Sequence, residues 1–157
     1  SYYKADPEHI TMDVFDGMIN ALCRSDMMKK ALKAFDGDRD KADKVVETLV
    51  KEKFIDDLRY SSAFARDKAS LAGWGQTKIR YMLSAKGISK EVMTAALGEI
   101  DGEKAADKLE RLMANKFKSL KDDPQCRMKM LRFALGRGYD YEEASSVLDK
   151  LVRQQDK

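Results

Sequence analysis

The sequence repeats itself at a fixed offset of 51 residues, and this repeat constrains the fold more than any other feature. When Gly87 is placed over Gly138, four apolar columns align without gaps across three copies. The columns are Ala42/Met93/Ala144, Val45/Ala96/Val147, Val46/Leu97/Leu148 and Leu49/Ile100/Leu151. Within each copy the four positions are spaced i, i+3, i+4 and i+7, which is one face of an amphipathic α-helix. The chain is therefore predicted to be a tandem array of helical units.

Two further columns mark where helices begin and end in each copy. They are Asp38/Ser89/Asp140, just before the apolar stripe, and Asp36/Gly87/Gly138, slightly earlier. The first column supplies side-chain oxygens that can cap a helix N-terminus, and Glu143 would complete a capping box with Asp140. The second column suits the left-handed residue that ends a helix. Each copy is therefore predicted to contain a helix, a tight turn and a second helix.

A third helical pattern precedes each pair, with predicted starts at Thr11, Asp56 and Asp101. The middle helix repeats in register as Met28/Ile79/Met130, Ala31/Met82/Phe133 and Leu32/Leu83/Ala134, and Pro124 fits its first position in the third copy. We predict an all-α fold in which three tandem three-helix repeats form an elongated, curved array. The expected divisions are an N-terminal segment at 1–10 and repeats at 11–53, 54–101 and 102–157.

The overall charge is nearly balanced, but its distribution along the chain is uneven. The 30 basic and 27 acidic residues leave a net charge of +3. The segment from Lys104 to Arg137, however, contains ten Lys and Arg residues and only four acidic residues. A basic helical segment of this kind can bind nucleic-acid phosphates without sequence specificity, which stays open as an alternative function.

Residues suited to catalysis or metal binding are sparse. His9 is the single histidine, and Cys23 and Cys126 are too far apart to form a metal-binding spacing. The acids of Asp36–Asp40 resemble the start of a calcium loop, but Lys41 stands where the sharp turn requires glycine. We therefore expect no enzyme activity, no cofactor and no metal. Two lone thiols, and the lack of a long apolar run, lead us to expect a cytoplasmic protein without membrane contact. Because a repeat array needs no partner to close its core, we expect a monomer.

Three short motifs in order resemble those of the RecX family, which regulates the RecA recombinase. Ile55–Tyr60 resembles L-D-D-x-R-[FY], Gly75–Ile88 resembles G-x3-I-x3-L-x2-[KR]-G-[IV], and Phe133–Tyr139 resembles the ending L-x-R-G-[FY]. Where family members carry Arg-Glu-His-Ser, this chain has Arg24–Met28, so we expect Asp26 to cap that helix. The matching positions, for which we expect mainly structural roles, are Asp56, Asp57, Arg59, Tyr60, Gly75, Ile79, Leu83, Lys86, Gly87, Arg137 and Gly138.

The resemblance implies a non-enzymatic protein that binds in the groove of the RecA–DNA filament. It also implies inhibition of recombinase and ATPase activity, and thus modulation of DNA repair and recombination. Weak nonspecific contact with DNA could accompany this role. We select ten cations as candidate contacts with the partner: Arg59, Arg66, Lys78, Arg80, Lys86, Lys116, Lys118, Arg127, Arg132 and Arg137.

The aromatic residues offer one further candidate contact. Trp74 lies between two glycines, so it could be an exposed anchor or could cover the core of the second repeat. We expect the covering role. We also expect Tyr139, Tyr141 and the methionines to serve in the core and at helix ends.

Overall fold

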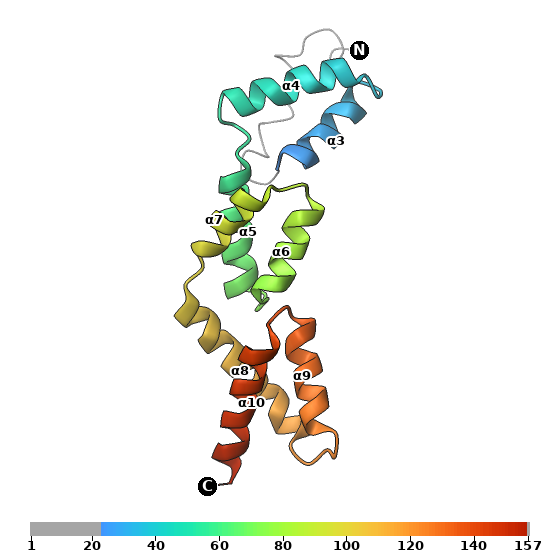
Figure 1. Ribbon diagram of the computed structural model, residues 1–157. Helices are drawn as coiled ribbons and strands as arrows, with labels where there is room; N and C mark the ends of the chain where they lie inside the picture. Colours follow the sequence, from blue (N-terminus) through green and yellow to red (C-terminus); the bar gives the residue numbers. More distant parts are fainter. Residues whose placement is uncertain (1–22, 157) are drawn as a thin grey trace.

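The computed structural model describes residues 23–156, and this part of the chain is helical throughout, without strands. Figure 1 shows the helices arranged as an elongated array that runs from the N-terminal to the C-terminal end. The helices are α3 (Arg24–Ala34), α4 (Arg39–Lys51), α5 (Asp57–Ser70), α6 (Gln76–Ala85), α7 (Lys90–Gly98), α8 (Gly102–Leu120), α9 (Cys126–Gly136) and α10 (Tyr141–Gln155). The predicted all-α repeat fold is confirmed.

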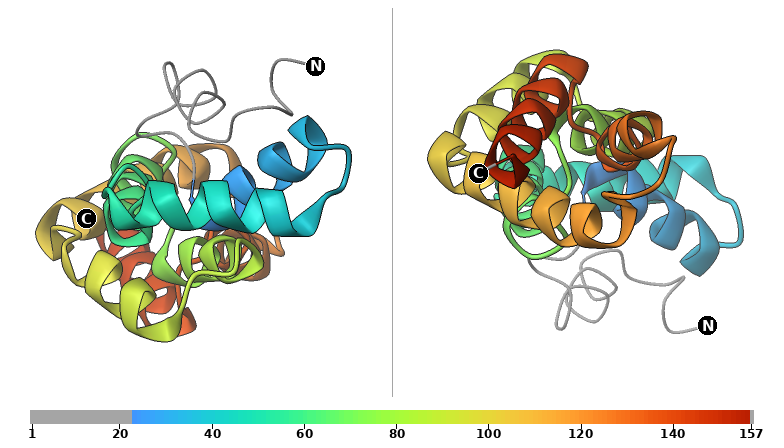
Figure 2. Two further views of the ribbon diagram at one scale, coloured as in Figure 1. Left: turned by 90° about the horizontal axis from the view of Figure 1, so that it is seen from above. Right: turned by 90° about the horizontal axis from the view of Figure 1, so that it is seen from below.

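The second and third repeats each contain three helices, α5–α7 and α8–α10. In the first repeat the described residues contain α3 and α4; the helix expected after Thr11, together with His9 and the segment 1–10, lies outside the described residues. When the array is viewed along its length, the repeats overlap in projection, which fits growth along one axis (Figure 2). The exact repeat boundaries stay predictions.

Three apolar clusters form the core, one centred on each repeat. The aligned stripes lie inside them: Ala42, Val46 and Leu49 are fully buried in the first cluster, for example. In α3 the fully buried methionine is Met27, whereas Met28 of the predicted stripe is half-buried. The apolar stripe of the last helix in each repeat therefore packs that helix against the core of the same repeat.

The predicted helix ends are confirmed at the polar and left-handed columns. Asp38 and Ser89 each accept a bond from the backbone N–H three residues on. Asp140 accepts from Glu143 N, whose side chain in turn accepts from Asp140 N, so the capping box forms. In the second column φ is 52°, 77° and 94° at Asp36, Gly87 and Gly138, as left-handed helix endings require.

Two predicted helix starts are wrong. Pro124 lies before α9 rather than at its first position, because Asp123 accepts a bond from Gln125 N (2.8 Å) and forms a turn that delays the helix to Cys126. Asp26 does not cap α3, because it lies inside the first turn and binds a lysine of the next repeat.

The second and third repeats meet through their backbones. Gly75 N donates to the carbonyl of Arg137 (2.7 Å), and Thr77 N donates to the carbonyl of Gly138 (3.0 Å). A Cβ atom at Gly75 would lie 2.3 Å from the oxygen of Gly138, and one at Gly138 would lie 2.3 Å from Cβ of Lys78. Because these distances are far below van der Waals contact, glycine is required on both sides of this joint.

The first and second repeats meet at the equivalent place, but mainly through side chains. The hydroxyl of Ser25 donates to the carbonyl of Lys86 (2.6 Å), and the ammonium of Lys86 contacts both carboxylate oxygens of Asp26 (3.0 and 3.1 Å). Asp57 accepts from the backbone N–H of Arg24 (2.9 Å), which satisfies an amide in the first turn of α3. Lys86 and Arg137 are equivalent positions of the repeat. The backbone carbonyl at this position is therefore the acceptor in both joints.

Replacing Gly75 with alanine should disrupt the joint between the second and third repeats. We expect Gly75→Ala to lower the free energy of unfolding by about 2–3 kcal/mol, because the added methyl group meets backbone atoms that cannot rotate away. Urea denaturation followed by circular dichroism measures this change. Gly98→Ala is the control, since its Cβ meets no atom within 4 Å, and it should change stability by less than about 1 kcal/mol. Similar losses for both variants would contradict the close contact.

Candidate partner-binding surface

The motif residues lie mostly in the core, at helix ends and in the joints between repeats. Ile79 and Leu83 are fully buried, and Asp56 caps α5 by accepting from Leu58 N and Arg59 N. Asp57, Lys86, Gly75, Arg137 and Gly138 form the two joints. Tyr60 stacks on Phe64, with ring centroids 6.0 Å apart. These contacts hold the repeats in place, and none of them needs a second molecule.

Six of the ten candidate cations contact other parts of the protein. The contacts are Arg59 with the Phe54 carbonyl (2.9 Å), Lys86 with Asp26 (3.0 Å), Arg127 with Asp149 (3.2 Å), Arg137 with the Ala72 carbonyl (2.9 Å), Lys78 with the Trp74 ring (4.3 Å) and Lys116 with the Phe133 ring (5.5 Å). In the case of Lys86 and Arg137 the contact crosses a joint. Their charge reversal would therefore change the repeat geometry as well as the surface charge.

The other four candidate cations are Arg66, Arg80, Lys118 and Arg132, on α5, α6, α8 and α9. All four side chains are exposed, and no hydrogen bond or ion pair joins them to another group within residues 23–156. Within residues 23–156, a partner can therefore contact each of these side chains without breaking a hydrogen bond or ion pair. They are the best placed of the ten for binding.

Trp74 packs against the core of the second repeat, as expected. Its half-buried ring also lies beneath two lysines, with the ammonium of Lys68 at 4.7 Å and that of Lys78 at 4.3 Å from the ring centroid. The ring meets Phe64 edge-on, with centroids 6.3 Å apart. Cations held this close to an indole face are attracted by its quadrupole, so the lysines restrict access to the ring.

A cleft of about 540 Å³ between α5, the connection that follows α7, and α8 brings together cations that are distant in the sequence. The charged residues that line it are Arg66, Glu99, Asp101, Lys104, Asp107, Lys108 and Arg111. Only Arg66 was among the candidate contacts, because periodicity within one helix does not show that α5 packs against α8. Four cations against three acids give the cleft only a small positive excess.

Tyr141 lies at a helix end as expected, as the first residue of α10, but both Tyr141 and Met128 are exposed. Tyr139 is buried as expected, with 5% exposure, but Tyr141 is 55% exposed and Met128 is 47% exposed. Both lie on the outer side of α9 and the start of α10, where the described helices do not cover them.

None of the helices within residues 23–156 is both long and apolar enough to cross a membrane. The same residues contain no group of three His, Cys, Asp or Glu side chains placed to hold a metal ion.

The helices, caps and joints together define a tandem three-helix-repeat protein. Residues 56–97 match the family model described as RecX, second three-helix domain, and residues 103–148 match RecX, third three-helix domain. The chain is 31% identical over 147 residues to regulatory protein RecX of Clostridium tetani, covering 83% of this chain and 67% of that one. The chain belongs to the RecX family.

Other relatives agree with this assignment. Regulatory protein RecX of Clostridium botulinum, strain Eklund 17B, is 34% identical over 119 residues, which is 73% of this chain and 55% of the relative. The chain thus spans between about half and two thirds of the length of these curated relatives. A crystal structure of RecX from Lactobacillus salivarius superposes with a TM-score of 0.79 at 19% identity, covering 94% of this chain and 97% of that one. A second crystal structure, of regulatory protein RecX, gives 0.78 at 21% identity and covers 93% of this chain and 73% of that one, so both support the fold.

The Lys86–Asp26 contact across the first joint should stabilise the array. In a double-mutant cycle of Lys86→Met and Asp26→Asn we expect a coupling energy of about 0.5–1 kcal/mol, since the lysine side chain is 37% exposed and solvent screens the pair. Urea denaturation at pH 7 measures it. The Arg39–Asp43 pair is the control. Its side chains are 70% and 41% exposed, so its coupling energy should be smaller than that of Lys86 and Asp26.

The same contact predicts a change at alkaline pH. The hydrogen bond to Asp26 raises the pKa of Lys86 above its ordinary value of 10.5. The stabilisation is therefore complete below the unfolded-state pKa and is lost as the pH rises through the folded-state pKa. Lys86→Met should reduce this alkaline loss of stability, and an unchanged alkaline profile would contradict the assignment.

Proposed function

We propose that this protein is a non-enzymatic regulator that binds the RecA–DNA filament and inhibits its recombinase and ATPase activities. Membership of a family of regulatory proteins supports the proposal. The observation that carries it is the pair of joints, which hold the repeats in a line with exposed candidate cations on α5, α6, α8 and α9. A line of repeats can contact several subunits of a filament at once and gain avidity without a deep pocket.

RecA ATP hydrolysis on single-stranded DNA, titrated with this protein at fixed salt, tests the proposal. We expect inhibition at less than one molecule of this protein per RecA, and we expect it to survive a large excess of added DNA. Inhibition that disappears with the added DNA would show competition for DNA instead. No inhibition at equimolar protein would contradict the proposal.

Reversing the charge of three exposed cations should weaken the inhibition. We expect Arg66→Glu, Arg80→Glu and Arg132→Glu together to raise the concentration needed for half-inhibition by about tenfold or more, because the reversed charges oppose binding at this surface. All three side chains are exposed and make no hydrogen bond or ion pair within residues 23–156. The control carries the same change in charge at exposed lysines of the first repeat, Lys30→Glu, Lys44→Glu and Lys51→Glu. Equal effects in the two triple variants would indicate net charge rather than a defined surface.

Direct binding to nucleic-acid backbone is the second candidate function. The cleft that joins Arg66 to Lys104, Lys108 and Arg111 favours it, since four cations converge there from two helices. Three acids in the same cleft reduce its attraction for phosphate, so we rank this function below filament regulation.

The salt dependence of oligonucleotide binding separates the two candidates. If the cleft binds phosphates, Lys104→Glu with Arg111→Glu should reduce the slope of log K against log salt by about 1.4, at about 0.7 per phosphate of a single strand. Fluorescence anisotropy of a labelled oligothymidylate measures the slope. Lys30→Glu with Lys44→Glu is the control, and a slope near zero in the unmodified protein would rule the candidate out.

A further inference from the structure

The outer face of α9 exposes a stripe of apolar side chains. Met128 is 47% exposed and Leu135 is 46% exposed, with Leu131 half-buried between them. Their spacing of i, i+3 and i+7 places them on one face of the helix. The opposite face supplies Met130 and Ala134 to the core of the third repeat, so the stripe is not needed there.

The other repeats show that this apolar stripe is not required by the fold. In the repeat alignment its columns are Asp26/Thr77/Met128, Lys29/Arg80/Leu131 and Lys33/Ser84/Leu135, and a fourth is Arg39/Lys90/Tyr141. The first two repeats carry polar or charged residues at all four positions, and only the third is apolar. The same helix arrangement therefore forms with polar residues at these places, and the apolar residues point to a binding role.

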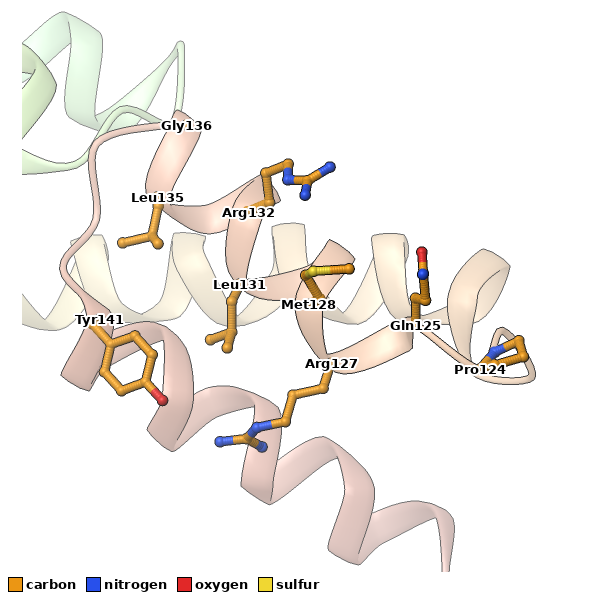
Figure 3. Close-up of a pocket in the computed structure, with 9 residues that line it drawn as sticks. All are labelled: Pro124, Gln125, Arg127, Met128, Leu131, Arg132, Leu135, Gly136 and Tyr141. Atoms are coloured by element: carbon orange, nitrogen blue, oxygen red, sulfur yellow. The ribbon is translucent and has the colours of Figure 1, made fainter.

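Together these side chains line an open groove of about 940 Å³ between α9 and the start of α10. Figure 3 shows Leu131 and Leu135 projecting from α9 on the side where Tyr141 projects from α10. Arg127 and Arg132 lie on the two edges of the helix, either side of the apolar residues. The groove thus has an apolar floor and basic rims, a shape suited to an amphipathic helix.

The charges decide what kind of molecule fits the groove. α9 carries Arg127, Lys129 and Arg132 and has no acidic residue. A second copy of this chain that paired through the same face would bring these cations against their own counterparts. Lys129 contacts Asp123 and Arg127 contacts Asp149, but Arg132 has no ion pair within residues 23–156. An acidic partner gives Arg132 a counter-ion, and a basic partner is repelled.

We propose that the groove on α9 binds an acidic amphipathic helix of a protein partner. The partner's apolar side chains lie over Met128, Leu131, Leu135 and Tyr141, and a carboxylate of the partner meets Arg132. The groove shares Arg132 with the cations proposed to contact RecA, but the assay below contains no RecA, so each proposal can fail alone.

A fluorescein-labelled helical peptide of about 18 residues tests the site by anisotropy. It carries leucines at i, i+3, i+4 and i+7 and glutamates on the flanking positions. Two control peptides carry lysines in place of the glutamates, or the same composition with the leucines scattered. We expect the acidic peptide to bind at least about tenfold more tightly than either control.

Two protein variants locate the binding. Met128→Thr, Leu131→Gln and Leu135→Ser together should weaken binding about tenfold or more, and two of these changes introduce the residues found in the second repeat. Arg132→Glu alone should weaken binding of the acidic peptide and strengthen binding of the lysine peptide. The control variant, Leu71→Ser with Tyr81→Gln, removes exposed apolar side chains outside the groove and should not change the affinity for the acidic peptide. Circular dichroism checks that each variant keeps its helix content.

Four results would overturn the proposal. One is equal binding of the acidic and lysine peptides, and another is unchanged binding by the Met128, Leu131 and Leu135 variant. The third is a dimer in sedimentation that this variant abolishes, because the groove would then be occupied by a second copy. Failure of the acidic peptide to bind the unmodified protein would also reject it.

Discussion

The geometry of the second and third repeats depends on a backbone contact in which two glycines leave no room for a side chain. The amides of Gly75 and Thr77 donate to carbonyls of the next repeat, and a Cβ at either Gly75 or Gly138 would overlap its neighbours. Backbone atoms have no rotamers, so this contact fixes both the distance and the register of the repeats. The surface positions of both repeats are set by it.

Within residues 23–156 the sequence was sufficient to predict the helices, apart from the start of α9, because the signals for them are local. Stripes at i, i+3, i+4 and i+7 gave the buried faces, and Asp38, Ser89 and Asp140 gave the starts of their helices. Asp26 was misassigned because its partner, Lys86, is 60 residues away and belongs to another repeat. A single helix carries no information about a contact of that kind.

The candidate surface was harder to predict than the fold for a related reason. The sequence pattern around an exposed lysine or arginine is the same whether its side chain binds another molecule or contacts the neighbouring repeat. The column Phe35/Lys86/Arg137 shows this, because Phe35 lies in its own core while Lys86 and Arg137 reach the preceding repeat. The repeat columns of the exposed apolar stripe do distinguish α9, because they hold apolar residues only in the third repeat.

The joint between the second and third repeats also bears on how such a protein can diverge. Its hydrogen bonds join backbone atoms, so outward-facing residues can change without altering the distance from one repeat to the next. The third repeat has an apolar outer face where the second has Thr77, Arg80 and Ser84, yet both adopt the same three-helix unit. A lineage can therefore acquire a new ligand in one repeat while the others keep an older one, provided that the glycines are retained.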